Sequence, residues 1–400
     1  MANVSSSNGL EKRPKLRFPG FDEPYRTTPL GEIASLVNRT DPKSNAPIMM
    51  LSAGNGFIMQ SEKYSRDNAG QSLKKYILLK QGELAYNHGA SKAKQFGCCY
   101  ELTEPEARIP YVYHCFKIND HEYTPFIAMA LNNAKMDKQL KRLVSSSVRM
   151  DGLLNISFED YMSVTLHLPS STEQKHIADF LKKIDERIAA QEKLLASLKK
   201  YKRGLLMHYF SDDKTQLWTQ CSVSQIGKVV TGSTPPTNDR SNYDGDLLFC
   251  APGDVGEQKY ISSTEKRVSP KGFALGRPLP PNSVIVTCIG LIGKLGIAKT
   301  SMITNQQINA LVVSEGFDHE FIYYAFENFF PEYRSKVSMQ TLPILSKSEF
   351  EKLMIKVPDL DVQHKISSHL AAMDRRIEHT QQELNALIEH RRGIMQQLFI

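Results

Sequence analysis

Apolar residues recur at alternating steps of four and three residues in two stretches of this chain. In the first stretch the apolar positions are Ile177, Leu181, Ile184, Ile188, Leu195, Leu198 and Leu205. Heptad spacing of this kind places a narrow apolar seam along one side of a helix, which suits pairing with a second helix better than lying on a broad core. The sequence therefore predicts a long amphipathic helix over residues 169–210.

A second seam has the same spacing and predicts a second helix over residues 358–400. Its apolar positions are Ile366, Leu370, Met373, Ile377, Leu384, Leu387 and Ile394. Both seams are interrupted at the same two places, first by Gln191 and Thr380 and then by Lys202 and Arg391.

The two stretches are copies of one segment, separated by 189 residues. Identities at this constant offset extend beyond the apolar positions to Pro169 and Pro358, Gln174 and Gln363, Asp185 and Asp374, Arg187 and Arg376, Arg203 and Arg392, Gly204 and Gly393, and Phe210 and Phe399. Matched proline, aspartate, arginine and glycine residues are typical of a duplicated unit rather than of two unrelated amphipathic helices. The protein is therefore predicted to consist of two half-molecules in tandem.

Seams of equal length favour a mutual coiled coil over two helices that pack separately on their own domains. A helix of roughly 36 residues is about 54 Å long. A parallel pair would force residues 211–357 to run back over that distance, whereas an antiparallel pair lets this segment begin and end at one pole. We expect an antiparallel coiled coil with a globular domain at each end and approximate, or pseudo-two-fold, symmetry.

These considerations divide the chain into five parts. We expect an N-terminal extension over 1–25, a first globular domain over 26–168, a central helix over 169–210, a second globular domain over 211–357 and a C-terminal helix over 358–400.

Each globular segment has the pattern of a mixed α/β (α+β) domain with short strands. Strands are predicted at Tyr76–Leu79, Gly82–Tyr86 and Ser283–Thr287. Both segments close with a helical stretch, a polar turn and a strand, because Ile156–Leu168 and Leu345–Val357 match at the same offset.

The composition is that of a globular protein of the cytoplasm. Of the 400 residues 41% are hydrophobic, enough for two domain-sized cores, and no apolar run approaches the roughly 20 residues of a membrane span. The N-terminal stretch has no apolar centre, so we expect no secretory signal. Cys98, Cys99, Cys115, Cys221, Cys250 and Cys288 form no CxxC pair and indicate reduced, mostly buried thiols rather than disulfides or a zinc site.

The formal charge of +7 is modest for a protein that binds nucleic acid. The net charge is +1 over residues 1–25, +3 over 26–168, +4 over 169–210, 0 over 211–357 and −1 over 358–400. Any DNA-binding surface on the globular domains must therefore come from local clustering.

Catalytic motifs are weak. The GLIGKL tract at 290–295 lacks the glycine spacing and the Ser/Thr of a phosphate-binding loop, so we expect a turn between strands. Residues 234–237 have the Pro-Pro of an amino-methyltransferase loop without its aromatic residue, which favours a proline-rich turn. Asp254, Glu257 and Lys259 have the residue types of a nuclease metal site, but such spacing is common by chance. The 11 histidines are expected to be mostly solvated.

Several blocks resemble the specificity subunits of type I restriction-modification systems. They are the LRFPGF block followed by PLGEI within Lys15–Ile33, TGSTP at 231–235 with GDLLF leading to Asp254, NQQINAL at 305–311, and the repeats that end in KRGLL and RRGIM. The resemblance covers nearly the whole chain. The family usually has tryptophan before the first PLGEI block, where this chain has Tyr25, while Trp218 occupies the equivalent position in the second half.

The resemblance implies that each globular segment is a target-recognition domain that reads one half of a bipartite, asymmetric DNA target. The helix pair would set the spacer between the half-sites. It further implies double-stranded DNA, two methyltransferase subunits and restriction (translocase) subunits as partners, with no catalysis and no cofactor in this chain. S-adenosylmethionine, ATP and Mg2+ would be used by the partner subunits for adenine methylation and DNA cleavage.

Loop residues with amide, hydroxyl or cationic side chains are candidates for base contacts, since these groups suit guanine and adenine edges in the major groove. They are Asn87, Lys92 and Lys94 in the first domain and Thr231, Ser233, Arg240, Lys294, Gln306 and Gln307 in the second. The alternatives are a solvated loop or, for Gln306, Gln307 and Asn309, a structural turn. On the helices Lys182, Lys183, Lys199 and Lys200 lie away from the seam and are expected in solvent, with phosphate or partner contact second.

Two other classes of function remain open. A single-chain enzyme that combines modification with recognition is opposed by the missing cofactor motifs, and S-adenosylmethionine binding by the isolated chain would support it. A scaffold that bridges only proteins predicts no DNA sequence preference.

Overall fold

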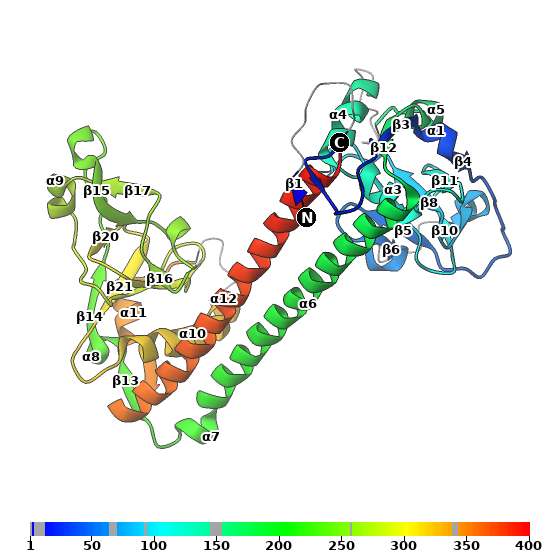
Figure 1. Cartoon of the computed structure of the whole chain (residues 1–400). Coiled ribbons are helices and arrows are strands. Elements are labelled where there is room, and N and C mark those ends of the chain that lie inside the picture. Colours follow the sequence, from blue (N-terminus) through cyan, green and yellow to red (C-terminus); the bar gives the residue numbers. More distant parts are fainter. Residues whose placement is uncertain are drawn as a thin grey trace. The chain divides into compact units, whose positions relative to one another are not determined.

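The computed structural model describes residues 2–3, 13–63, 70–91, 94–144, 154–256, 258–337 and 343–400. The chain forms two compact units. The first unit comprises Met1–Gln191 and Glu383–Ile400, and the second comprises Glu192–Gln382. Each unit is a mixed α/β domain that also contains part of both long helices (Figure 1).

The first unit has short strands and helices. They are β1 (Ala2–Asn3), β2 (Leu16–Arg17), β3 (Arg26–Pro29), α1 (Leu30–Ile33), β4 (Ala34–Leu36), β5 (Met49–Ser52), β6 (Gly56–Met59), α2 (Gln60–Lys63), the 3-10 helix η1 (Gly70–Lys75), β7 (Ile77–Lys80), β8 (Leu84–Asn87), β9 (Cys98–Glu101), β10 (Glu106–Ile109), β11 (His114–Ile118), α3 (Thr124–Leu131), α4 (Ala134–Leu143), α5 (Phe158–Met162) and β12 (Thr165–Leu168).

A four-stranded sheet, ordered β4-β11-β8-β9, lies at the centre of the first unit. Because successive side chains of a strand point to opposite faces, the sheet has two buried faces. Leu84, Tyr86 and Phe116 pack on the side of the helices, while Ala85 and Cys115 pack with the β5–β6 hairpin and the antiparallel pair of β7 and β10. The sheet therefore separates a helical layer from a second β layer.

The second unit is built from its own set of elements. They are α7 (Asp212–Thr215), β13 (Thr219–Ser222), α8 (Val223–Ile226), β14 (Gly227–Thr231), η2 (Arg240–Asn242), β15 (Tyr243–Cys250), η3 (Pro252–Asp254), β16 (Tyr260–Ile261), β17 (Lys266–Val268), α9 (Pro270–Leu275), β18 (Val284–Thr287), β19 (Leu295–Ala298), β20 (Met302–Thr304), β21 (Ile308–Val313), α10 (His319–Val337), α11 (Lys347–Lys352) and β22 (Met354–Val357).

The central sheet of the second unit is ordered β14-β21-β18-β19-β16, which repeats the order of the first unit and adds one edge strand. Its faces alternate in the same way, since Val284 and Val286 pack toward α10 and Ile285 packs toward the other side. The second layer differs from that of the first unit. It is a three-stranded sheet ordered β17-β15-β20, in which β15 and β20 are parallel.

Equivalent hydrogen bonds in the two units establish the duplication at atomic level. The backbone N–H of Leu30 donates to Val164 O at 2.8 Å, and that of Val223 donates to Leu353 O at 2.9 Å. The capping box of Ser157 at the start of α5 recurs at Ser346 at the start of α11, 189 residues later. The predicted match between the two closing segments is therefore confirmed.

The side chains of Gln174 and Gln363 also have the same role in both units. Each donates an amide hydrogen to the proline carbonyl five residues earlier, Gln174 to Pro169 O at 3.0 Å and Gln363 to Pro358 O at 2.9 Å. Their amide oxygens accept from the backbone N–H groups of Tyr123 and Asp318, respectively. The duplicated glutamine thus fastens the start of each long helix to its own domain.

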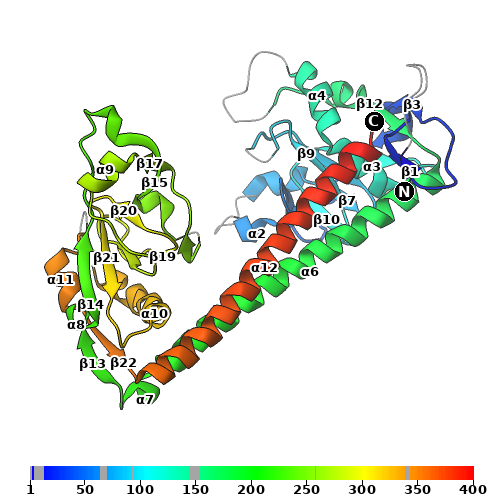
Figure 2. The ribbon, with the colours of Figure 1, turned by 60° about the vertical axis from the view of Figure 1, so that its left-hand side comes forward.

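The two long helices are α6 (Ser171–Tyr209) and α12 (Leu360–Leu398), each of 39 residues. They run side by side in opposite directions within each unit (Figures 1 and 2). In the first unit Arg391 Nη2 lies 2.9 Å from Asp185 Oδ2, and Gln191 Nε2 lies 2.7 Å from Glu383 Oε2. Later residues of α6 therefore contact earlier residues of α12, which confirms the antiparallel coiled coil.

A buried cation joins the helices in the second unit. Lys202 Nζ lies 2.7 Å from Asp374 Oδ1 and 2.9 Å from Glu327 Oε1, and the Lys202 side chain is only 12% exposed. Tyr324 donates its hydroxyl to the other Asp374 oxygen at 2.5 Å. Lys202 and Arg391 occupy equivalent positions, as do Asp374 and Asp185, so the interruption in each seam pairs with the duplicated aspartate of the opposite helix.

The first six seam residues of each helix, from Ile177 to Leu198 and from Ile366 to Leu387, are all buried or half-buried. The last residues of each long helix enter the core of the domain that precedes the other long helix, which does not fit the alternative of two helices that pack only on their own domains. Phe399 stacks on Phe126 with ring centroids 5.1 Å apart, and its duplicate Phe210 lies 5.6 Å from Phe321.

Replacing Lys202 by methionine should destabilise the second unit by about 3–5 kcal/mol, because two buried carboxylates lose their cation. Burial already raises the pKa of Glu327. The loss of stability should therefore grow as the pH rises, because at higher pH the folded state has to hold the Glu327 carboxyl in its charged form. Urea unfolding of wild type and K202M between pH 5 and 8 measures this difference. Lys199→Met, at an exposed position of the same helix, should change stability by less than about 0.5 kcal/mol.

Candidate nucleic-acid interface

The described residues offer no metal site and no reactive thiol. No group of three or more His, Cys, Asp or Glu side chains in this part of the chain is placed to hold a metal ion. All six cysteines are unpaired, and burial raises the pKa of Cys98 to about 11 and that of Cys250 to about 12. Five of the six are buried, all except Cys221, as the sequence predicted for mostly buried thiols.

The three weak catalytic motifs have structural roles where they are described. Residues 290–294 form the turn between β18 and β19, as expected. The proline-rich segment after Gly232 is a loop, and its carbonyls accept hydrogen bonds from Tyr243 Oη and Asn242 Nδ2.

The nuclease-like residues are also engaged. Asp254 accepts backbone hydrogen bonds from Ala251 and Glu265, both at 2.8 Å, and Lys259 pairs with Glu320 at 3.0 Å. Glu257 lies outside the described residues.

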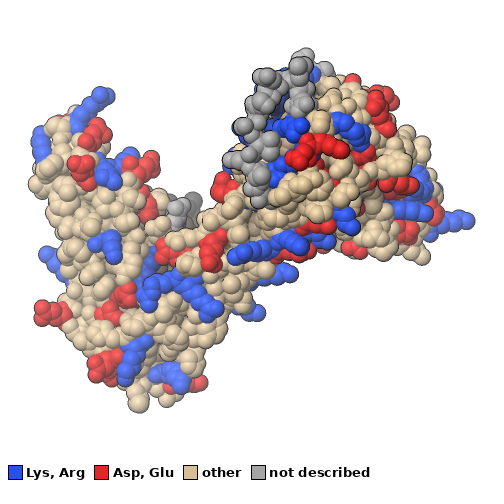
Figure 3. Space-filling view, viewed as in Figure 1, with Lys and Arg blue, Asp and Glu red and all other residues tan. Residues whose placement is uncertain are grey.

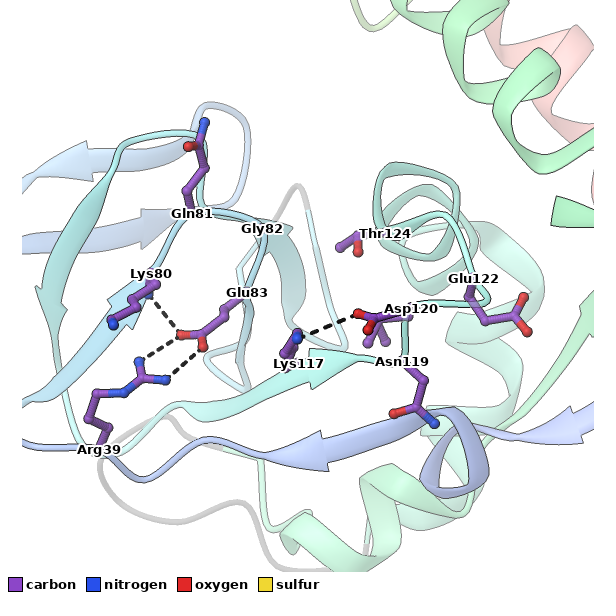
Figure 4. A pocket seen from close by; sticks show the side chains of 11 residues that line it. Arg39, Lys80, Gln81, Gly82, Glu83, Lys117, Asn119, Asp120, Glu122 and Thr124 are labelled. Carbon is purple, nitrogen blue, oxygen red and sulfur yellow. Dashed lines mark hydrogen bonds and ion pairs between the residues drawn. The ribbon is translucent and has the colours of Figure 1, made fainter. Parts of the chain in front are cut away.

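A polar pocket of about 570 Å³ in the first unit offers no catalytic arrangement either (Figure 4). Glu83 receives two hydrogen bonds from the Arg39 guanidinium, at 2.9 and 3.1 Å, and one from the backbone N–H of Lys80 at 2.8 Å. Lys117 lies 3.6 Å from Asp120. Each of these two carboxylates is thus neutralised by a neighbouring cation, and the Arg39–Glu83 pair holds the β7–β8 turn.

Two histidines differ from the expectation that histidines are solvated. His88 is 7% exposed, and His114 stacks on it with ring centroids 5.0 Å apart. His114 Nε2 donates to the carbonyl of Ile156 at 2.9 Å, and burial lowers the pKa of this histidine. The expectation was wrong here because His88, directly after β8, and His114, at the start of β11, lie inside the domain, where their rings bond backbone carbonyls.

In the second unit, loops distant in sequence meet at one edge of the central sheet. The backbone N–H of Ser233 donates to Thr304 O at 2.9 Å, and that of Cys288 donates to Gln307 O at 2.8 Å. The N–H of Gly290 donates to Pro343 O at 3.0 Å. We call this group of loops, residues 231–239, 287–294, 304–308 and 343–345, the reading edge.

The reading edge contains five of the six candidates from the second domain, and the sixth, Arg240, begins η2 directly after its first loop. Thr231 donates to Asn309 Oδ1 at 2.7 Å, and Gln307 accepts from Asn305 Nδ2 at 3.1 Å, so both side chains have structural partners. Arg240 and Gln306 are exposed, while Ser233 and Lys294 are half-buried. The structure brings these side chains together but does not by itself assign base contacts, which remain predictions.

The first-domain candidates are less concentrated. Asn87 ends β8, and its side-chain oxygen accepts the N–H of Gly89 at 2.9 Å. Lys94 donates from Nζ to Asn132 O at 2.8 Å. Lys92 lies outside the described residues. Asn87 and Lys94 therefore have local structural partners, which leaves their proposed role in DNA reading as a prediction.

The charge count by domain missed a local signal. Residues 266–314 contain six Lys or Arg residues and no Asp or Glu, although the second domain as a whole has zero net charge. This acid-free segment supplies β18 and β21 and two loops of the reading edge, and it includes the exposed Arg277, which donates to Thr231 O at 2.8 Å. On the face drawn in Figure 3, cationic and anionic side chains are interspersed over each unit. A running charge count along the sequence would have located the segment.

The lysines on the long helices and the two aromatic residues near the domain starts have clear positions in the structure. Lys182, Lys183, Lys199 and Lys200 are exposed, as expected. Tyr25 is buried, and its ring lies 5.3 Å from the Arg17 guanidinium, whereas Trp218 packs against Phe210 and Phe321. No helix in the described part of the chain combines the length and apolar character needed to cross a membrane.

Comparisons with known proteins agree with this architecture. A family model described as the type I restriction modification DNA specificity domain matches residues 74–200 and 216–390. The specificity subunit of the type I restriction enzyme MjaIX from Methanocaldococcus jannaschii is 30% identical over 178 residues, which cover 43% of this chain and 41% of that protein. The specificity subunit of the type I restriction enzyme HindI from Haemophilus influenzae is 28% identical over 108 residues, 26% of this chain and 24% of that protein. The chain thus spans less than half the length of these relatives.

Solved structures share the fold over almost the whole chain. The S subunit of a type I restriction-modification system from M. genitalium superposes with a TM-score of 0.63 at 14% identity, covering 97% of this chain and 99% of that one. A chain from a study of complex assembly and conformational transition of the type I R-M system gives a TM-score of 0.57 at 16% identity, covering 95% and 98%. Since the family model matches a segment in each half and more than half of all residues, this chain belongs to the family of type I restriction-modification specificity subunits.

Proposed function

We propose that this chain is the DNA-reading specificity subunit of a type I restriction-modification complex, and that it reads a bipartite, asymmetric target. The observation that carries the proposal is that the two units repeat one framework but differ in the layer and loops built on it. The first unit adds two antiparallel strand pairs to its central sheet, β5 with β6 and β7 with β10, and the second adds the β17-β15-β20 sheet. Two units that share a framework but carry different surfaces are suited to two different half-sites.

In this proposal the long helices set the spacer between the half-sites. A helix of 39 residues is about 58 Å long, and half-sites on one face of a duplex are about 34 Å apart per helical turn. Ion pairs join the two helices of this element, Asp185 with Arg391 in the first unit and Lys202 with Asp374 in the second. The length of the helix pair can then change in steps of one heptad.

Catalysis belongs to partner subunits in the proposed complex. Two methyltransferase subunits would bind this chain and use S-adenosylmethionine to methylate adenine, and restriction subunits would use ATP and Mg2+ to translocate and cleave DNA in the cytoplasm. Adenine methylation requires the base to leave the duplex, so the specificity subunit would position that base for its partner. The chain itself would hold none of these cofactors.

Selection from random duplexes tests the proposal. The purified chain with its methyltransferase partner should enrich two short, different motifs at a fixed separation. Absence of any enriched motif would support a scaffold that bridges only proteins. Binding of S-adenosylmethionine by the isolated chain would instead support a single-chain modification enzyme.

Shortening both helices by one heptad tests the role of the helix pair. Deleting residues 188–194 and 382–388 keeps the Asp185–Arg391 and Lys202–Asp374 pairs and shortens the pair by about 10 Å, or about three base pairs. The selected spacer should become shorter by that amount while both motifs stay the same. Alanine at Glu192 and Lys193, which changes exposed side chains without changing length, should leave the spacer as it is. An unaltered spacer in the deletion variant would contradict the proposal.

A further inference from the structure

Leu291 is an exposed apolar side chain at the tip of the β18–β19 turn. Its side chain is 58% exposed, whereas the next residue, Ile292, is 2% exposed. Ile344 is 53% exposed and lies beside the same turn, since it forms an antiparallel bridge with Ile289. We call Leu291 and Ile344 the apolar tip.

The turn that carries Leu291 is held rigidly. Gly290 and Gly293 have φ angles of +74° and +76°, which favour glycine, and a side chain at Gly293 would meet the Phe330 ring at 2.5 Å. The fully buried Thr287 hydroxyl donates to Leu291 O at 2.5 Å and accepts the N–H of Lys294 at 3.0 Å. The turn is therefore held by glycine conformations and by bonds to backbone groups, none of which involves the Leu291 side chain.

An exposed amide lies in the turn that precedes β21, in the reading edge. Cys288, three residues before Leu291, donates its N–H to Gln307 O at 2.8 Å, and Gln306 is exposed at this point. Thr234 donates its hydroxyl to Gln306 Oε1 at 2.6 Å. This bond fixes the oxygen of the Gln306 amide, and among the described residues no hydrogen bond engages its Nε2 group.

An A·T base pair displays the chemistry that fits this combination. In the major groove adenine offers N7 and N6, which a glutamine amide can bind, and thymine offers its 5-methyl group, which an apolar side chain can contact. The acid-free segment 266–314 carries Leu291 and Gln306, so no carboxylate of that segment repels the phosphates. The two apolar residues and the oriented amide thus lie where DNA can approach.

We propose that the apolar tip contacts the methyl group of one thymine in the half-site read by the second unit, with Gln306 bound to an adenine beside it. This inference rests on the proposed function and names the base that the second unit recognises. Binding of the tip to a protein subunit instead of DNA is the competing outcome.

Single replacement of thymine by deoxyuridine tests the inference, because it removes only the methyl group. The full-length chain with its methyltransferase partner is titrated with duplexes that carry the selected target, each with one thymine replaced. One replacement should weaken binding about fourfold, the effect of one buried methyl group. In Leu291→Ala the thymine duplex should bind several-fold more weakly, and the same replacement should have little further effect, because the two groups act as a pair.

Leu217→Ala provides the matched control, since Leu217 is 98% exposed in the same unit but lies outside the reading edge. It should keep both the wild-type affinity and the full deoxyuridine effect. Ile344→Ala should reduce the deoxyuridine effect partly. Leu291 is exposed, so its substitution should leave the unfolding transition unchanged.

Three results would overturn the inference. One is a target whose thymines can all be replaced without loss of affinity. Another is a deoxyuridine effect of the same size in Leu291→Ala and wild type. The third is that Leu291→Ala weakens association with the methyltransferase subunit and leaves sensitivity to deoxyuridine intact, which would make the tip a protein contact. If the wild-type chain selects no DNA at all, the proposed function fails first, and the selection experiment shows this separately.

Discussion

Two charge pairs between the long helices, Asp185 with Arg391 and Asp374 with Lys202, decide which residues of these helices face one another. An apolar seam with heptad spacing would tolerate a slip of seven residues, since leucine or isoleucine would again meet leucine or isoleucine. Such a slip would place Asp185 opposite Leu384 or Leu398 and leave a charge without its partner. The same slip would separate Lys202 from Asp374, and Lys202 is only 12% exposed. Removing the partner of a buried charge costs several kcal/mol, so this pair in particular specifies the register.

The pairing of the long helices also completes each domain core. Phe126 and Phe321 receive Phe399 and Phe210, which come from the ends of different helices. Each core therefore contains residues from both long helices, and neither globular segment of the sequence forms a complete folding unit without them. This explains why the compact units divide the chain in the middle of both helices rather than at the proline that begins each one.

The two units share one framework but differ in the surface layer built on it. His114 and Asn309 occupy equivalent strands and donate to equivalent carbonyls, of Ile156 and Leu345, although their side chains are unlike. What was retained is a hydrogen bond to a buried carbonyl, which is costly to leave unsatisfied. The second β layers had no such constraint in common and differ in strand number and direction. A pair of domains with one skeleton and two surfaces is suited to reading two unlike sequences.

The sequence alone was sufficient for the repeat, the long helices, their antiparallel pairing and the mixed character of each domain. The helices and strands follow from periodicity within short windows of sequence, and the repeat follows from identities between two such windows at one offset. The residues from 231 to 307 that form the reading edge are separated by tens of positions, so only the pairing of β14, β18 and β21 brings them together. The same holds for Lys202, whose two carboxylate partners come from separate helices, and for His88 and His114, whose burial depends on a strand facing inward. The contrast has one physical cause: local patterns fix secondary structure, whereas a site depends on long-range contacts that no window of sequence contains.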